Sequence, residues 1–348
     1  MAESIPKTMK AAQLIEFKKK YEIREIPVPQ LGENDLLLKM GAAGFCHTDY
    51  QVWEGVYGSK LPLVPSHEPV GTIVAVGSKV KDPWKVGQRV GSLLFKHQCH
   101  HCEGCKATND VRFCENNETA GLHNDGGMAE YFIADPATTV LLPDSIPFEQ
   151  AAPLMCAGAT VWNGIKAGGA KPSEPVGIIG IGGLGTLAVQ FAKAIGHPVV
   201  ALDNRIEGKD LAQGFPLKAD LVLSEFDDHA LEKVKKWSGG AGLAAIVVCT
   251  DHNSAIQWST KALRPRGVCV PLGLPVDGWK LDAFDVIFQE KTIKGSLVST
   301  KSETDDMLAC VDKFGIRSHI TTVPLEKVPD LPQMYMDPHL KGRLVLKF

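Results

Sequence analysis

The feature that most constrains the fold is a regular alternation of short apolar runs with helical segments between residues 176 and 298. Helical patterns separate the runs, and in "GGLGTLAVQFAKAIG" apolar residues recur every three or four positions, as on one face of a helix. Strands that alternate with helices favour a doubly wound parallel sheet. The six strand candidates are "VGIIG", "PVVALD", "ADLVLS", "LAAIVVC", "GVCVPLG" and "IKGSLV".

The turn after the first of these strands carries a glycine pattern. Gly180, Gly182 and Gly185 form Gly-x-Gly-x-x-Gly, with Gly183 and Leu184 inside it. Glycines at this spacing let the backbone approach a pyrophosphate at a helix N-terminus. The match alone is weak in a chain with 34 glycines, and a Gly-rich turn without a ligand is the alternative. Its place between a strand and a helix predicts a Rossmann dinucleotide site.

The second strand candidate ends in Asp203, eighteen residues after the last glycine. A carboxylate at this position accepts hydrogen bonds from a ribose diol and repels a 2′-phosphate, which favours NAD over NADP. Arg205 and Lys209 follow closely and weaken that preference, so NADP remains possible.

The chain has 348 residues, which suggests two domains at ~100–200 residues each. Residues 1–157 contain short β-like runs broken by Gly and Pro and predict a mostly β domain. Residues 158–298 form the dinucleotide-binding domain. Residues 299–348 are too few for a domain, and we expect them to return to the first one.

Charge and hydropathy exclude several classes of protein. A net charge of −3 gives no reason to expect a nucleic-acid partner. No apolar run reaches the ~18 residues that a membrane helix needs. The start, "MAESIPKTMKAAQL", has no apolar signal core. We therefore expect a cytoplasmic protein whose cysteines stay reduced.

Four of the nine cysteines lie within "CHHCEGCKATNDVRFC". Four thiolates can close a tetrahedral zinc shell, which predicts a structural zinc lobe at about residues 97–116. An iron–sulfur cluster and unligated thiols are the alternatives. Ferredoxin patterns place the fourth cysteine about four positions on, before a proline, whereas here it comes nine positions on, before Glu115. His100 and His101 are expected to be solvated. The four predicted ligands are Cys99, Cys102, Cys105 and Cys114.

A second candidate site is dispersed along the chain. Cys46 lies in "GFCHTDY", His67 and Glu68 lie in "PSHEPVG", and Cys156 lies in "LMCAGAT". Taken singly, each residue also has a purely structural explanation: a buried thiol for the cysteines, a core imidazole for the histidine and a solvated carboxylate for the glutamate. Their spacing does not unite them.

A set of motifs in a fixed order unites them instead. The chain carries "CHTD", "HEPVGTIVAVG", the four-cysteine lobe, "DGGMAEY", "CAGAT", "GIGGLG" and "KGRLVL". Together these resemble the zinc-dependent medium-chain alcohol dehydrogenases, particularly their yeast-type branch, over essentially the whole length. The resemblance implies a GroES-like catalytic domain beside the Rossmann domain. It also implies an alcohol, aldehyde or ketone substrate, two zinc ions per chain, and a homodimer or homotetramer.

The resemblance also implies roles for residues of the dispersed site. Cys46, His67 and Cys156 would hold a catalytic zinc, with one position left for water or substrate. Glu68 would lie beside the metal, as a ligand or as an aid to ligand exchange. Asp49 would orient His67.

Further residues match positions that serve the substrate proton and the coenzyme. Thr48 would take the substrate proton and pass it to the coenzyme ribose. His47 and Arg343 would contact the pyrophosphate. The residues that match positions around the nicotinamide are Thr160, Leu272, Leu274 and Val298, of which the three apolar ones are equally consistent with core.

The sequence departs from the family pattern near the predicted active site. Gln51 stands where the yeast-type relay ends in a histidine, and an amide cannot act as a general base. We therefore expect proton release through water or another group. Ser66 replaces the glycine before His67, and we expect the turn there to be reshaped. Tyr57, where the yeast type carries a tryptophan, and Phe95 match positions that line the substrate pocket.

The four-cysteine lobe departs as well. Between Cys105 and Cys114 the spacing is one residue longer than usual. The lobe should still close around zinc, because an extra loop residue costs little free energy.

Two other functions remain open at this point. The chain could be a polyol dehydrogenase or a carbonyl reductase of specialised metabolism within the same superfamily. A non-catalytic zinc-binding interaction protein is the third hypothesis. The near-neutral charge and the dinucleotide pattern argue against it.

Overall fold

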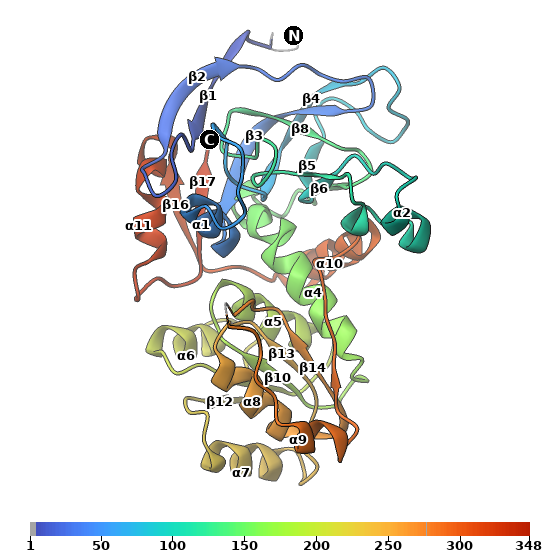
Figure 1. Ribbon diagram of the computed structural model, residues 1–348, viewed down its shortest axis with the longest axis vertical. Coiled ribbons are helices and arrows are strands. Elements are labelled where there is room, and N and C mark those ends of the chain that lie inside the picture. Colours follow the sequence, from blue (N-terminus) through green and yellow to red (C-terminus); the bar gives the residue numbers. More distant parts are fainter. Residues whose placement is uncertain (1–4, 276) are drawn as a thin grey trace. The chain divides into compact units, whose positions relative to one another are not determined.

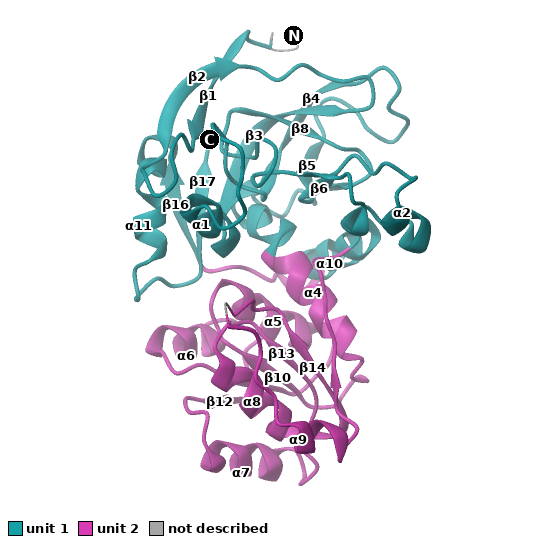
Figure 2. Cartoon of the chain, in the orientation of Figure 1, with its two compact units in different colours: residues 1–156, 300–312, 320–348 teal, residues 157–299, 313–319 magenta. Residues whose placement is uncertain are grey.

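The computed structural model describes residues 5–275 and 277–348, and the chain divides into two compact units (Figure 1, Figure 2). Unit 1 comprises residues 1–156, 300–312 and 320–348, and unit 2 comprises residues 157–299 and 313–319. The C-terminal segment thus returns to unit 1 at residues 300–312 and again from residue 320 onward, while residues 313–319 belong to unit 2.

Unit 2 is built on the predicted six-stranded parallel sheet, in the order β12-β11-β10-β13-β14-β15. β11 and β12 extend to one side of β10, and β13, β14 and β15 extend to the other. The turn after β10 therefore lies at the point where the strand order reverses, which is where doubly wound sheets bind ligands. The strands are β10 (Val176–Ile179), β11 (Val199–Leu202), β12 (Leu221–Leu223), β13 (Leu243–Val248), β14 (Leu263–Pro271) and β15 (Thr292–Ile293).

The helices of unit 2 follow the apolar periodicity of the sequence. In α5, Leu187, Ala188 and Phe191 are completely buried. The helix ends just before Gly196, whose left-handed conformation (φ +91°) does not continue a helix. α7 begins at Asp227, whose carboxylate accepts the Ala230 N–H at 2.7 Å as an N-cap. The helices are α4 (Ala157–Gly168), α5 (Gly183–Ala194), α6 (Ile206–Gln213), α7 (Asp228–Trp237), α8 (Asn253–Ala262) and α9 (Ala283–Ile287).

Unit 1 is mostly β, as expected for a GroES-like domain. Its main sheet has the order β16-β17-β3-β4-β5-β9, with β8 also paired to β3. The C-terminal strand β17 pairs antiparallel with β3, so that Leu344 lies opposite Phe45. The sheet strands are β3 (Leu36–Phe45), β4 (Pro69–Val76), β5 (Arg89–Ser92), β8 (Tyr131–Ala134), β9 (Thr139–Leu141), β16 (Ile320–Pro324) and β17 (Arg343–Lys347).

Short elements complete unit 1. β1 and β2 form an antiparallel hairpin, and β6 and β7 flank the cysteine lobe. The remaining strands are β1 (Thr8–Gln13), β2 (Glu22–Pro27), β6 (Phe95–Lys96) and β7 (Glu118–Thr119). The helices are α1 (His47–Glu54), α2 (Glu103–Thr108), η1 (Val111–Phe113), α3 (Phe148–Ala151), η2 (Ala152–Met155), α10 (Lys301–Phe314), η3 (Leu325–Asp330) and α11 (Leu331–Tyr335), and α10 runs from unit 1 into unit 2. Among the described residues, every helix is too short or too polar to cross a membrane.

Candidate active site

The dispersed candidates converge in unit 1 at the ends of three elements. Cys46 follows β3 and caps α1, His67 and Glu68 directly precede β4, and Cys156 follows η2. Cys46 Sγ lies 3.8 Å from Cys156 Sγ, and His67 Nε2 lies 3.1 Å from the same sulfur. With a Glu68 oxygen, the donor atoms all lie within 4.8 Å of one another.

This donor set fits a zinc ion. Zinc–sulfur bonds of about 2.3 Å at a tetrahedral angle place two sulfurs about 3.8 Å apart, which is the observed separation of Cys46 Sγ and Cys156 Sγ. The hydrogen bond between the two thiols lowers the pKa of Cys46 well below its usual value and raises that of Cys156. One of the two is therefore ready to serve as a thiolate ligand.

Glu68 contributes a carboxylate with one oxygen free. The side chain is fully buried, its Oε1 accepts a hydrogen bond from Arg343 Nη2, and its Oε2 has no partner among the described residues. Burial, opposed by the charge of Arg343, raises the pKa of Glu68 to about 7. Gly44 of β3 lies so close that an added Cβ would come 1.7 Å from Oε2, so only glycine leaves room for the carboxylate.

Arg343 therefore has a partner that the sequence did not reveal. The resemblance assigns it to the coenzyme pyrophosphate, but in the structure it is 4% exposed and its guanidinium holds Glu68. β17 and β4 both pair with β3, which brings Arg343 at the start of β17 beside Glu68 just before β4. A contact between Arg343 and the coenzyme stays a prediction.

Asp49 ties the loops of the cluster together. Its Oδ2 accepts the Cys46 N–H at 2.8 Å, and its Oδ1 accepts the Ser66 N–H at 2.9 Å. The same Oδ1 lies 3.6 Å from Nδ1 of His67. The carboxylate thus faces the Nδ1 edge of the imidazole while Nε2 faces the sulfurs, which is the orientation expected for a metal-binding histidine.

Ser66 does not reshape its turn, contrary to expectation. The residue adopts φ +79°, the left-handed conformation that glycine would take most easily. Its hydroxyl donates to the Gly44 carbonyl at 2.7 Å and accepts the Glu68 N–H at 3.2 Å. These two buried hydrogen bonds offset a conformational cost of about 1–3 kcal/mol.

The four cysteines of the lobe form the second cluster, and their sulfurs also lie within 4.8 Å of one another. Cys99 Sγ and Cys105 Sγ are 3.9 Å apart, again close to the separation that tetrahedral zinc requires. Hydrogen bonds, first among them one from Asn116, lower the pKa of Cys99, whereas burial raises that of Cys105. The extra residue between Cys105 and Cys114 does not prevent the ligand atoms from meeting, because η1 returns the chain to the cluster.

The glycine turn of unit 2 has the geometry of a pyrophosphate site. Gly180 has φ +86°, and a Cβ on Gly185 would lie 2.0 Å from the Gly180 carbonyl oxygen, so both positions require glycine. At Gly182 an added Cβ would meet only Arg205 Nη2, at 3.8 Å. Space is therefore open beside this glycine at the start of α5, which begins at Gly183 and continues with Leu184.

Asp203 directly follows Leu202, the last residue of β11, and both of its carboxylate oxygens are engaged. Oδ2 accepts the Ile181 N–H at 2.7 Å, and Oδ1 accepts the Arg205 N–H at 2.9 Å. The Arg205 guanidinium also pairs with Oδ2 at 3.2 Å. A cation therefore covers the carboxylate that is predicted to select NAD.

The four candidates for contact with the nicotinamide lie in unit 2, and their role stays a prediction. Thr160 lies on α4, and Leu272 follows β14. Leu274 is 70% exposed, which excludes the alternative that it belongs to the core, whereas Val298 is buried, with φ +22°.

Two side-chain hydrogen bonds at α1 are not indicated by any pattern in the sequence. The Tyr57 hydroxyl donates to Gln51 Oε1 at 2.8 Å, and Tyr335 Oη lies 3.1 Å from Nδ1 of His47. No motif marks Tyr335, which reaches His47 from α11 in the C-terminal segment. Thr48 lies on the same helix, and Phe95, the other expected pocket residue, lies on β6.

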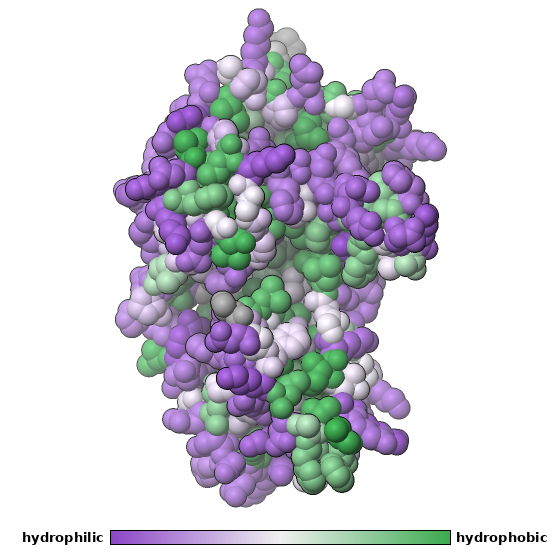
Figure 3. Space-filling view, in the orientation of Figure 1, coloured by the Kyte–Doolittle hydropathy of each residue, from purple (hydrophilic) through white to green (hydrophobic). Residues whose placement is uncertain are grey.

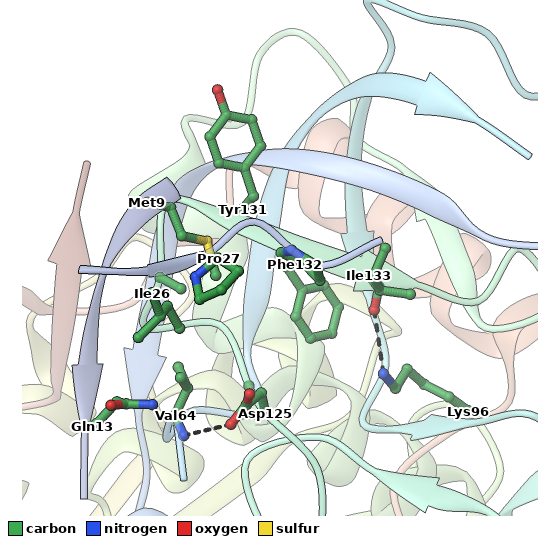
Figure 4. Close-up of a pocket in the computed structure, with 13 residues that line it drawn as sticks. Met9, Gln13, Ile26, Pro27, Val64, Lys96, Asp125, Tyr131, Phe132 and Ile133 are labelled. Carbon is green, nitrogen blue, oxygen red and sulfur yellow. Dashed lines mark hydrogen bonds between the residues drawn. The ribbon is translucent and has the colours of Figure 1, made fainter. Parts of the chain in front are cut away.

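A cavity of about 400 Å³ in unit 1 contains none of the predicted site residues (Figure 4). It is lined mainly by β1, β2 and β8. At its edge the Asp125 carboxylate accepts the Val64 N–H at 2.8 Å, and Lys96 Nζ donates to the Ile133 carbonyl at 3.3 Å. Its polar groups thus largely serve the protein's own backbone.

Comparison with known proteins identifies the family. The alcohol dehydrogenase GroES-like domain matches residues 32–144, and the zinc-binding dehydrogenase family matches residues 183–313. An alcohol dehydrogenase of Geobacillus stearothermophilus is 38% identical over 97% of this chain and 99% of its own.

Solved structures agree. A cinnamyl alcohol dehydrogenase from Sorghum bicolor is 27% identical, with a TM-score of 0.86 over 98% of each chain. The acetophenone reductase of Geotrichum candidum, solved in complex with NAD, is 26% identical, with a TM-score of 0.86 over 99% of each chain. These similarities agree with the two donor clusters suited to zinc and with the glycine turn of unit 2. The chain therefore belongs to the zinc-dependent medium-chain alcohol dehydrogenases.

Proposed function

We propose that this protein is a zinc- and NAD-dependent dehydrogenase that transfers a hydride between an alcohol and the nicotinamide, or reduces the corresponding aldehyde or ketone. One observation carries the proposal. Cys46 Sγ, His67 Nε2 and Cys156 Sγ meet in one donor set whose sulfurs are 3.8 Å apart. Three protein ligands of this kind leave one position of a tetrahedral ion for substrate, as a catalytic site needs.

The chain's own residues have distinct roles in this reaction. Bound zinc supplies a Lewis acid that favours loss of the alcohol proton, and the nicotinamide supplies the hydride acceptor. Asp49 keeps Nε2 of His67 turned toward the sulfurs. Thr48 takes the proton from the substrate hydroxyl. Glu68 holds its free oxygen within reach of the three ligands, while Arg343 neutralises its charge.

A spectrophotometric test decides the reaction class. Purified protein should produce NADH, read at 340 nm, from at least one member of a panel of primary, secondary and aryl alcohols and polyols. Cys46→Ser should lower kcat/KM by at least ~10³-fold, because loss of one soft ligand compromises the metal. Cys310→Ser, which changes a cysteine outside both clusters, is the control. Equal rates for Cys46→Ser and wild type would contradict the proposal.

The substrate is proposed to be bulkier than ethanol. Tyr57 presents a smaller ring than the tryptophan of the yeast type. The sorghum and Geotrichum relatives are named for aryl substrates, cinnamyl alcohol and acetophenone. A D-arabinose dehydrogenase of Sulfolobus solfataricus is 26% identical, so polyols and sugars form the alternative class in the panel.

Branch and compartment are further proposals. The matching alcohol dehydrogenases include bacterial, nematode and fungal proteins, and the yeast-type branch rests on motifs such as "CHTD". Both metal clusters need reduced thiols, which favours the cytoplasm.

A second copy of the chain is the proposed partner. Around α9, apolar side chains are exposed, and they gather in the lower part of the space-filling view (Figure 3). Phe284 and Phe288 stack at 4.2 Å while 66% and 72% exposed, and Ile287 is 69% exposed. β15 is the edge of the parallel sheet, with backbone groups available for pairing with the same edge of another copy.

Zinc content separates the two clusters. Wild type should hold two zinc ions per chain by elemental analysis. Cys114→Ser should lose one ion and several degrees of melting temperature. It should keep most of its activity, because four protein ligands leave no position for substrate at its cluster and the metal there only stabilises the fold. Cys156→Ser should lose the other ion together with activity. Iron in place of zinc, or loss of activity from Cys114→Ser while the fold is retained, would contradict this assignment.

Coenzyme choice depends on the Asp203–Arg205 pair. Arg205→Ala should raise the ratio of kcat/KM for NAD to that for NADP about tenfold, because it exposes the Asp203 carboxylate to a 2′-phosphate and removes a cation that would bind it. The measurement compares both coenzymes with one alcohol. Arg264→Ala, which breaks an ion pair with Glu174 in the turn before β10, is the control. An unchanged ratio would show that Arg205 does not tune selectivity.

Self-association depends on the α9 patch. Phe288→Glu should reduce the mass measured by light scattering from that of an oligomer toward the 37.6 kDa of one chain, because a charge cannot be buried in an apolar interface without a partner. Phe314→Glu, an exposed phenylalanine at the end of α10, should leave the mass unchanged. A monomeric wild type, or an oligomer that survives Phe288→Glu, would exclude this interface.

A further inference from the structure

The cavity lined by β1, β2 and β8 in unit 1 contains a buried glutamine (Figure 4). Gln13, the last residue of β1, is 8% exposed, and within the described part of the chain its side-chain amide forms no hydrogen bond. Burying an amide without a partner is unfavourable, because the group loses its hydrogen bonds to water. A molecule in the cavity could supply the missing partner.

Backbone pairing brings a second polar group to the same end of the cavity. Leu14 and Leu63 form an antiparallel bridge, with N–H to carbonyl bonds of 2.8 and 3.1 Å. Gln13 therefore lies opposite Val64. The Val64 N–H donates to Asp125 Oδ1 at 2.8 Å, while Asp125 Oδ2 bonds to none of the described residues. The amide and the carboxylate thus lie on either side of Val64, as Figure 4 shows.

The rest of the lining is mainly apolar. Met9 and Ile26 lie opposite each other in the β1–β2 hairpin, and Phe132 of β8 is 3% exposed. The volume of about 400 Å³ lies toward the lower end of the ~300–1,000 Å³ that is typical of small-molecule sites. The cavity therefore has the size and the lining for a molecule with one ring or a short chain.

The charged groups at the cavity favour a neutral ligand. Lys96 Nζ donates to the Ile133 carbonyl, lies 3.5 Å from Glu118 Oε2, and lies 5.1 Å from the centroid of the Phe132 ring. The protein thus balances the charge of this ammonium. A cationic ligand would be repelled by Lys96, and an anionic ligand would be repelled by Asp125.

We propose that this cavity binds a small neutral molecule that carries a carboxamide on an apolar ring or chain. A carboxamide has two N–H donors and one carbonyl acceptor, which match the groups at the polar end. Its N–H groups donate to Gln13 Oε1 and Asp125 Oδ2, and its carbonyl accepts from Gln13 Nε2. The apolar part packs against Met9, Ile26 and Phe132. This site is separate from the zinc ligands, and the inference does not depend on the proposed function.

The test titrates 4-fluorobenzamide into the purified full-length protein and follows the fluorine NMR signal of the probe. Wild type should bind the probe saturably. Gln13→Leu should raise the dissociation constant at least ~10-fold, because the hydrogen bonds to the carboxamide are lost. The same variant should bind 4-fluorotoluene, which lacks the carboxamide, no more weakly than wild type does. Ile26→Trp, which fills the cavity, should abolish binding of both probes. Ile23→Trp, on the same strand but outside the lining, is the matched control.

Three outcomes would overturn the proposal. A wild type without saturable binding would leave the cavity to water. Binding that neither Gln13→Leu nor Ile26→Trp weakens would place the probe elsewhere, for example at the metal site. Equal weakening of both probes by Gln13→Leu would remove the hydrogen-bonding role of the amide. Melting temperatures verify that the variants fold, and Gln13→Leu should melt close to wild type, because its amide bonds to none of the described residues. This variant therefore decides the outcome even if Ile26→Trp does not fold.

Discussion

The structure of unit 1 depends on burying several ionisable groups in one small volume. Two thiols, an imidazole and a carboxylate have their donor atoms within 4.8 Å of one another. Such a cluster is unfavourable without positive charge, because neither thiolates nor carboxylates are stable when buried and unpaired. Arg343 supplies one positive charge from the C-terminal strand, and a metal ion would supply the rest. The return of the chain to unit 1 is therefore an electrostatic requirement as well as a matter of topology.

The sequence predicted unit 2 well because its signals are local. Apolar periodicity marks helices such as α5, and glycines with forced conformations mark the turn after β10. The residues of the candidate active site were harder to predict from the sequence. Cys46 and Cys156 are 110 positions apart, and Glu68 and Arg343 are 275 apart, so no spacing rule connects them. Only the resemblance to a family predicted the ligands, and it did not predict the partner of Arg343.

Side-chain conformations were the other limit. Asp203 stands at the predicted position, yet whether its oxygens are free depends on backbone N–H groups of Ile181 and Arg205 that no pattern of residues specifies. The turn at Ser66 was expected to change because serine disfavours a positive φ. Backbone sterics alone favour glycine there, but the buried hydroxyl of Ser66 forms two hydrogen bonds that hold serine in the same conformation.

The departures from the family pattern share a physical logic. Ser66 keeps the conformation of the glycine it replaces because its hydroxyl connects β3 to Glu68. Gln51 lacks the titratable group of the histidine it replaces, but it bonds to Tyr57, itself a departure. In each case the substituted residue forms a side-chain hydrogen bond beside an element that positions the donor cluster. A substitution that supplies its own partner can therefore preserve ligand geometry, while the chemistry carried by the neighbouring side chains changes.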